Sequence, residues 1–221
     1  EQLESAEQRH EELRAAYLEQ EHILIEIRRR VDELTMLHQL TLHIGSTLDR
    51  ETIIGSGLKA IVGSLPYDHA WVALWNSHHQ LFHSIQTEGI SANGEAVVRD
   101  VHIPSTPQDL LHTTLHTQDP IVIEDIRVIL DQCHPVTGQM LADSGTRSGI
   151  ALALISQNQP LGVLIVGSHH LKTIPITDQN LLSTVAHAMA IALDTALAYE
   201  EIEALNIGLE TKVQERTAEL R

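Results

Sequence analysis

Histidine is the residue type in this sequence with the greatest potential for chemistry, since the chain has 15 histidines but a single cysteine. His112 and His116 are four residues apart, a spacing that puts two imidazoles on one face of a helix and suits a metal ion. The Glu of an HExxH motif is absent between them. The pairs 78–79 and 169–170 fall in expected turns, where adjacent side chains diverge. We therefore expect no metal site.

The sequence also contains no recognisable motif for nucleophilic catalysis. Ser, His and Asp are all present, but none stands in a nucleophile elbow. There is no Gly-rich phosphate loop and no ATP-binding motif of a histidine kinase. We expect this chain not to be an enzyme.

The excess of acidic residues limits the kinds of partner that this protein can bind. The chain has 30 Asp and Glu against 14 Lys and Arg, a formal net charge of -16. This opposes binding to the phosphates of nucleic acids and to anionic membranes. The single Cys133 predicts a cytoplasmic protein without disulfides, and no apolar run approaches a membrane span of roughly 20 residues. Because the sequence starts with Glu1, we expect it to be part of a longer protein.

Residues 1–36 form the first expected element, a long coiled-coil helix, because residues 1–34 contain no Gly or Pro. Apolar residues alternate at spacings of three and four, and the stronger half of this seam is Leu24, Ile27, Val31 and Leu34. After Leu34 the phase shifts, as in a helix that passes from a partner helix to a globular core. The alternative is an amphipathic helix that lies on its own domain.

The C-terminal region predicts a second long helix, capped by Thr177 or Asp178 and free of Gly and Pro until Gly208. Its Ala-rich first half suits close packing against the core. Residues 199–221 are expected to be a coiled-coil linker to an output domain, with its seam at Tyr199, Ile202, Asn206, Leu209 and Val213. Asn206 would fix the register of the coil. The alternative is that Asn206 and Gly208 mark a fraying end.

Between these helices the hydrophobic period changes to that of short strands. We expect helices at 51–64 and 105–115, the second with Pro107 in its first turn. Residues 125–142 are expected to be helical or irregular, broken by Pro135 and Gly138. Extended segments are expected at 70–75, 80–87, 96–103, 120–123, 147–155 and 161–167, and the last two form the clearest hairpin. This order predicts an antiparallel α+β sandwich.

Five segments in this order resemble a GAF domain over residues 37–198. They begin at Thr47, Pro120, Gly145, Pro160 and Ile176 and read TLDRE, PIVIEDI, GTRS, PLGVLIVGS and ITDQNLL. The resemblance implies a six-stranded antiparallel sheet with helices on both faces, flanked by long coiled-coil helices. It also implies a small-molecule pocket on one face and a parallel homodimer through the terminal helices. The tail from Leu209 is similar to the linkers of bacterial two-component histidine kinases.

The ligand of such a pocket stays open. From strand phase and position, we expect the pocket to involve Trp71, Phe82, His102, Leu111, His112, Ile126, Cys133, His134 and Ile150. In bilin-binding members of the family, a Cys followed by His lies between an Asp and an Arg, and its thiol attaches the chromophore. Asp125, Cys133 and Arg147 stand in this order, but Leu161 replaces the usual Trp and Pro135 follows the Cys-His pair.

Two other ligands of the family are also considered. Haem bound through one His stays open, although no single His stands out. The cyclic-nucleotide pattern fits poorly, because Ile174 or Ile176 replaces its Phe and Gln179 follows Asp178. The expected function is a cytoplasmic sensory and dimerisation module of a signalling protein, and the alternative is a ligand-free structural spacer.

Overall fold

The computed structural model describes residues 48–90 and 102–219, and residues 14, 17, 19–21, 23–25, 27, 28 and 31 of the N-terminal region. The chain divides into two units, Glu1–His38 and Gln39–Arg221. Every described residue of the first unit is helical and exposed, including Leu24, Ile27 and Val31 of the expected seam. Leu34 and most of the segment 96–103 lie outside the described residues, and pairing of this helix with a second copy stays a prediction.

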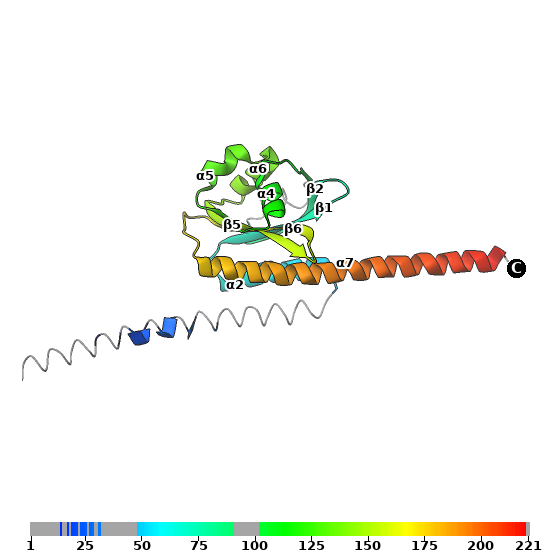
Figure 1. The fold of residues 1–221 in the computed structure, drawn as a ribbon, viewed down its shortest axis with the longest axis horizontal. Helices are drawn as coiled ribbons and strands as arrows, with labels where there is room; N and C mark the ends of the chain where they lie inside the picture. Colours follow the sequence, from blue (N-terminus) through cyan, green and yellow to red (C-terminus); the bar gives the residue numbers. More distant parts are fainter. Residues whose placement is uncertain are drawn as a thin grey trace, which may run out of the picture. The chain divides into compact units, whose positions relative to one another are not determined.

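The second unit is built on a six-stranded antiparallel sheet, which confirms the expected α+β class (Figure 1). The strand order is β3-β2-β1-β6-β5-β4. The strands are β1 (His69–Asn76), β2 (Leu81–Glu88), β3 (Ile103–Pro104), β4 (Ile121–Ile123), β5 (Ser148–Ser156) and β6 (Gln159–Ser168).

Helices cover both faces of the sheet. On one face α2 (Arg50–Ser64) packs against β1 and β2, and α7 (Ile176–Glu219) packs against β5, β6 and α2. The other face is covered by α4 (Leu110–Thr117), α5 (Ile126–Ile129) and α6 (Pro135–Asp143), with a short 3₁₀ turn, η1 (Leu130–Gln132), between the last two (Figure 1). The helices at the two ends of this unit therefore share one face, and the three short helices have the other.

Local sequence explains the clearest boundaries. Asp49 caps α2, because its carboxylate accepts a hydrogen bond of 2.9 Å from the backbone N–H of Thr52. The β5–β6 hairpin turns at Gln157 and Asn158, which both have positive φ, as a two-residue turn of this twist requires. The predictions of a helix at 51–64 and of this hairpin are confirmed.

Three boundaries differ from the sequence predictions. Pro107 lies in a turn ahead of α4, since the N–H of Asp109 bonds to Thr106 O and the helix begins at Leu110. The helical segment is broken ahead of Pro135, as predicted, and Pro135 begins α6 because its missing N–H is harmless in a first turn. Gly138 lies inside α6 and does not break it.

The start of the C-terminal helix is the third difference. Helix α7 starts at Ile176, ahead of the expected caps, and the N–H groups of Asp178 and Gln179 both reach Pro175 O. Asp178 instead accepts a buried hydrogen bond of 3.1 Å from the hydroxyl of Tyr67. This contact ties the first turn of α7 to the segment that leads into β1.

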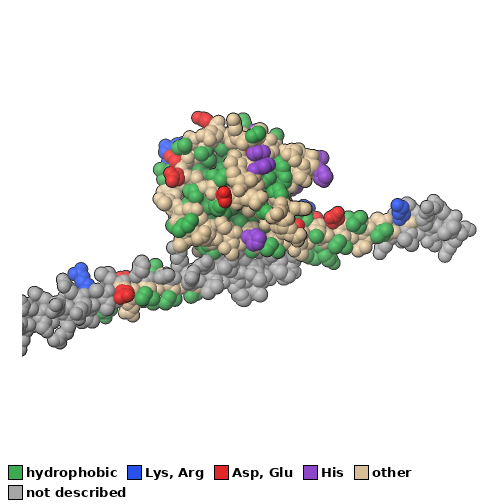
Figure 2. All heavy atoms as spheres, viewed as in Figure 1, with side chains coloured by type: hydrophobic (Ala, Val, Ile, Leu, Met, Phe, Trp, Pro, Cys, Tyr) green, Lys and Arg blue, Asp and Glu red, His purple; other side chains and the backbone are tan. Residues whose placement is uncertain are grey.

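Helix α7 continues without a break through Asn206 and Gly208, so the alternative of a frayed end at these residues does not hold. One face of its first half is buried against the sheet, whereas the described side chains from Tyr199 onward are exposed. Figure 2 shows apolar and acidic side chains along this exposed length. Within the described residues, α7 alone is long and apolar enough to cross a membrane, and half of its most apolar stretch is buried inside the domain.

Gly167 of β6 is expected to be irreplaceable, because an added Cβ would lie 2.3 Å from Nε2 of the buried His69. That ring is hydrogen-bonded to Thr146 and fully buried, so a shift away from the new Cβ would cost this bond. Gly167→Ala should lower the free energy of unfolding by about 2 kcal/mol, measured by urea denaturation. The matched control is Gly63→Ala on the exposed face of α2, where nothing lies within 4 Å, and it should stabilise by about 0.5–1 kcal/mol. Equal stability of the two variants would contradict the close approach.

Candidate functional site

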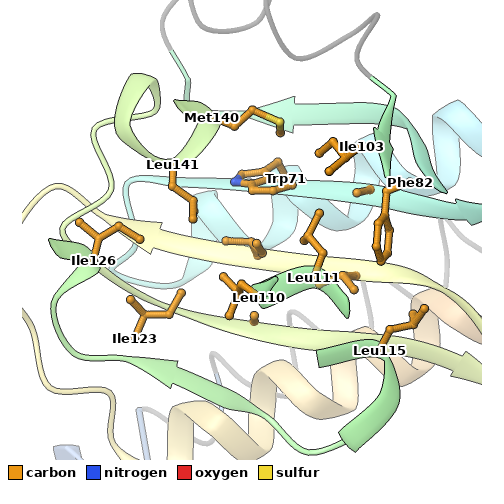
Figure 3. Close-up of a cluster of buried hydrophobic side chains, with 14 of the residues drawn as sticks. Trp71, Phe82, Ile103, Leu110, Leu111, Leu115, Ile123, Ile126, Met140 and Leu141 are labelled. Carbon is orange, nitrogen blue, oxygen red and sulfur yellow. The ribbon is translucent and has the colours of Figure 1, made fainter. Parts of the chain in front are cut away.

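A buried apolar cluster fills the space between the sheet and the three short helices (Figure 3). Because successive side chains of a strand point to opposite faces, one set from each central strand enters it. The strand members include Trp71 and Ala73 of β1, Ala151 of β5, and Val163 and Ile165 of β6. The helical members are Leu110, Leu111, Leu115, Ile126, Met140 and Leu141. This is the face on which the sequence placed a ligand pocket.

Most of the predicted pocket residues meet at this cluster. Trp71, Phe82, Leu111 and Ile126 are members, and Cys133 packs against it half-buried. Trp75 lies beside Phe82, with ring centroids 4.9 Å apart. That these residues contact a ligand stays a prediction.

Four predicted pocket residues are not members of the cluster: His112 of α4, His134 at the N-cap of α6, Ile150 and His102. Ile150 is fully buried but adjoins Ala151 in β5, so its side chain points to the opposite face, where α7 packs. A phase error of one residue in the strand caused this misplacement. His102 is exposed just before β3.

Trp71 carries a polar group that is buried inside the cluster without a partner among the described residues. Its side chain is 1% exposed, and its indole Nε1 has no hydrogen-bond partner among the described residues. An unpaired buried donor costs about 1–3 kcal/mol. The indole N–H is therefore a donor available to an acceptor atom that enters the cluster.

Asp109 joins two of the covering helices, a role that the sequence analysis missed. It stands at the N-cap of α4, yet its carboxylate accepts hydrogen bonds from the N–H of His134 (2.9 Å) and the hydroxyl of Thr137 (3.1 Å) at the start of α6. Burial raises the pKa of Asp109 above its ordinary value, partly offset by these two bonds. From the sequence, an Asp before the apolar Leu110-Leu111 indicates an N-cap of the helix that follows it. No sequence pattern shows that its carboxylate binds the start of α6 instead.

The Cys133 thiol is placed near Asp109 and is poorly activated. Burial raises its pKa, and the negative charge of Asp109 raises it further. Since the thiolate is the reactive form, this environment disfavours nucleophilic attack. His134 follows as the N-cap of α6, with Nδ1 accepting from Val136 N at 3.3 Å.

A buried hydroxyl chain ends at His69, another residue that the sequence did not indicate. Nε2 of His69 lies 2.8 Å from the hydroxyl of Thr146, which lies 2.7 Å from that of Ser144. Because the Ser144 hydroxyl donates to Leu141 O, Thr146 donates to Ser144 and the Nε2–H of His69 donates to Thr146.

The hydrogen-bonded network from Ser144 through Thr146 to His69 has a structural role. Burial, and next the charge of the stacked His169, lowers the pKa of His69 to about 4, so the ring is neutral at physiological pH. The hydroxyl proton of Ser144 is donated to the carbonyl oxygen of Leu141, so no basic side chain can accept it. The network therefore fastens β1 to the segment before β5 and holds no activated nucleophile.

A separate cleft of about 310 Å³ lies at the edge of the sheet, beside α7. It exists because β4 pairs only with Gly149, Ile150 and Ala151 of the nine-residue β5. Its lining is Gln118, Pro120, Leu152, Ala153, Ile155, Gln157, Asn158, Ser183, Ala186 and His187. None of the predicted pocket residues belongs to it.

The other candidate groups are placed as follows. Asp125 caps α5 and pairs with Arg127, whose hydrogen bonds lower the pKa of Asp125 to about 2. Within the described part of the chain, no three His, Cys, Asp or Glu side chains gather as a metal site would require. On α7, Tyr199, Ile202, Asn206 and Leu209 of the predicted seam are exposed, and the side chain of Val213 lies outside the described part.

Solved structures share this architecture at low sequence identity. The GAF domain of a phosphoenolpyruvate-protein phosphotransferase from Coxiella burnetii is 16% identical, with a TM-score of 0.64 over 77% of this chain and 98% of that one. A free methionine-R-sulfoxide reductase from Neisseria meningitidis, in complex with its substrate, is 17% identical, with a TM-score of 0.61 over 76% and 91%. The phycoerythrobilin-bound GAF domain of a cyanobacterial phytochrome is 13% identical, with a TM-score of 0.59 over 76% and 97%.

At these sequence identities the solved structures show the fold alone. The family is shown by a match of the sequence to a family model. No curated protein matches the chain. The sequence model described as GAF domain matches residues 47–194, the span that holds the sheet, both helical layers and the apolar cluster. The chain therefore belongs to the GAF domain family.

Proposed function

We propose that this GAF domain is the cytoplasmic sensory and dimerisation module of a larger signalling protein of the two-component histidine kinase type. A small ligand binds in the apolar cluster, and α7 passes the resulting change to a C-terminal output domain. The observation that carries the proposal is the continuity of α7. One helix of 44 residues packs one face of its first half against the sheet, and the described side chains of its second half, from Tyr199 onward, are exposed.

The coupling has a physical route. The central strands that present Trp71, Ala151 and Val163 to the cluster present their neighbouring side chains to the other face, where α7 packs on β5 and β6 and α2 packs on β1 and on α7. A ligand that shifts these strands changes the packing of α7. Such a ligand acts as a signal only if it binds one arrangement of α7 more tightly than the other.

The chemical class of the ligand follows from the cluster. Its walls are apolar, and its unpaired polar group is the N–H of Trp71. The proposed ligand is a small, mostly apolar molecule with one carbonyl or carboxylate oxygen aimed at that N–H. It enters by displacing the covering side chains of α4 and α6, such as Leu111 and Met140, because these now fill the space.

Trp71→Phe tests this assignment. A thermal-shift screen of apolar carboxylates and carbonyl compounds is expected to give a ligand that binds the wild type at least tenfold more tightly than the variant. The reason is that a lost hydrogen bond leaves the ligand oxygen buried and unpaired. Without ligand, the variant should stay within about 1 kcal/mol of the wild type, since the substitution also removes an unpaired donor.

The rival functions predict different results. A ligand-free spacer shows no stabilising compound in the screen. A covalent bilin sensor shows a visible absorption band and a mass increase that Cys133→Ala abolishes, and a haem sensor shows a band that survives this substitution. The raised pKa of Cys133 counts against the bilin. A hit that binds Trp71→Phe equally well would remove Trp71 from the site.

A further inference from the structure

The cleft of about 310 Å³ beside α7 contains an open edge of the sheet. Strand β4 pairs with β5 only at residues 149–151, although β5 continues to Ser156. Ahead of β4, Pro120 has no N–H to donate, and Gln118 is the left-handed C-cap of α4 (φ 62°). Residues 152–156 of β5 are therefore paired with a strand on the β6 side alone.

This edge presents backbone groups that the sheet does not use. Successive residues of a strand direct their backbone N–H and C=O groups to opposite sides. Part of the stretch 152–156 therefore directs these groups toward the cleft, and the other part directs them toward β6. Among the described residues, no hydrogen bond from outside the β5–β6 ladder reaches the backbone of this stretch. An open edge of this kind is a template for one more strand.

Three carboxamide side chains line the same cleft, at positions where glycine would suit the backbone better. They belong to Gln118, Gln157 and Asn158, which have positive φ angles of 62°, 48° and 64°. Residues with a side chain seldom adopt this conformation, whereas glycine adopts it freely. A carboxamide offers a donor and an acceptor, which are the complement of a peptide bond. The cleft thus carries groups that can bind a peptide backbone where conformation alone would favour glycine.

The charges around the cleft restrict what it can hold. No Asp, Glu, Lys or Arg lines it. Acidic side chains stand just beyond both ends of the open edge. Asp119 is exposed next to the lining residue Pro120, and Asp194 accepts a hydrogen bond of 2.8 Å from Ser156, the last residue of β5. This distribution of charge complements a segment with an uncharged centre and basic ends.

We propose that this cleft binds an extended peptide segment of a partner protein, which adds to β5 as the next strand where β4 ends. Main-chain hydrogen bonds to β5 supply the affinity, and side-chain contacts supply the specificity. The segment has small uncharged side chains at its centre, which meet Ala153 of β5 and Ala186 of α7, and Lys or Arg at its ends. It therefore touches the helix that leaves the domain. The site lies apart from the apolar cluster and does not depend on a ligand there.

Nuclear magnetic resonance of the isotope-labelled full chain tests the proposal with a probe peptide. The probe has acetylated and amidated ends and the one-letter sequence KVTVTVK. It should cause saturable shifts of the backbone amides of residues 152–156 and slow the hydrogen exchange of those that face the cleft. A second probe carries N-methyl groups on two successive central residues, so that one methyl replaces a donor aimed at β5. It should bind at least tenfold more weakly. Glutamate in place of both lysines should also weaken binding, less so at high salt.

Two glycine variants separate the carboxamide from the backbone conformation. Gln118→Gly should weaken the probe at least threefold, because the cleft loses a carboxamide, and should raise the melting temperature, because glycine suits a left-handed cap. Gln80→Gly is the matched control. Gln80 also has a positive φ (53°), in the β1–β2 turn, and does not line the cleft. This control should bind the probe as the wild type does.

Several results would contradict the proposal. They are the absence of saturable shifts at residues 152–156 with millimolar probe, equal binding of the N-methylated probe, and equal weakening in Gln80→Gly. Shifts of the same amides with rising protein concentration alone would assign the edge to a second copy and overturn the peptide partner. Trp71→Phe should bind the probe like the wild type, so failure of this site and failure of the proposed ligand in the apolar cluster are distinguishable.

Discussion

Asp109→Ala is expected to lower the free energy of unfolding by about 3 kcal/mol, whereas Asp109→Asn should change it by less than about 1 kcal/mol at neutral pH. The alanine variant leaves the N–H of His134 and the buried hydroxyl of Thr137 without an acceptor. An asparagine can accept from His134 through its oxygen and donate to Thr137 through its nitrogen. Urea denaturation at fixed protein concentration measures both variants.

The stability of Asp109→Asn relative to the wild type is expected to depend on pH, and the sign of this dependence follows from the pKa of Asp109. The pKa of Asp109 is raised in the folded state, because burial penalises the ionised carboxylate. The protonated form therefore favours folding, and its contribution to stability is complete below the unfolded pKa and is lost as pH rises through the folded pKa. Asparagine does not ionise. The stability of Asp109→Asn relative to the wild type should rise from the unfolded pKa of Asp, near 3.8, toward neutral pH.

A result in the opposite direction has a clear meaning. If Asp109→Asn loses stability relative to the wild type as pH rises, the ionised carboxylate is stabilised by its two hydrogen bonds more than burial penalises it. If Asp109→Ala matches Asp109→Asn at neutral pH, the bridge between α4 and α6 contributes nothing. The alkylation rate of Cys133 gives a second reading, since removal of the nearby negative charge should lower its pKa and speed the reaction.

The elements that local sequence encodes were predictable. The hairpin of β5 and β6, the Asp49 cap of α2 and the long C-terminal helix each depend on residues a few positions apart. The five motifs of the resemblance give the family because each one marks such a local structure. Asp125, for example, ends the second motif region as the cap of α5.

The features that the sequence did not indicate depend on contacts between distant segments. Asp109 meets Thr137 across 28 positions, and His69 meets Thr146 across 77. No periodicity records such pairs, because they arise only when the covering helices dock on the sheet. Ile150 failed for a different reason: both faces of β5 are buried, so its sequence has no polar alternation to fix the phase.

The exposed half of α7 presents an apolar stripe that is expected to dimerise the chain. Tyr199, Ile202, Leu205 and Leu209 are each more than half exposed. Burying such side chains contributes about 1–2 kcal/mol each. Eight of them in a dimer contribute about 10 kcal/mol, which is comparable to the free-energy cost of association. This stripe alone therefore roughly offsets the cost of association, and we expect a stable dimer to need the N-terminal seam as well.

Deletion of residues 199–221 should therefore raise the dissociation constant of the dimer at least a hundredfold, as measured by light scattering over a concentration series. The deletion also removes the ion pair of Arg50 with Glu200, but both side chains are substantially exposed, so its contribution is about 0–1 kcal/mol. A wild-type monomer at micromolar concentration would contradict the dimer itself.

Two single variants then determine which side chains form the seam. The sequence seam uses Asn206, whereas the neighbouring Leu205 is equally exposed on the same helix and also lies three or four residues from Ile202 and Leu209. If Asn206 faces the partner, Asn206→Leu should raise the melting temperature and permit other oligomers, because a buried Asn fixes register at a cost in stability. If Leu205 faces it, Leu205→Ala should weaken the dimer and Asn206→Leu should change neither property. The register found in this way determines which face of α7 contacts the partner, and hence which rotation of α7 the proposed ligand in the apolar cluster would have to oppose.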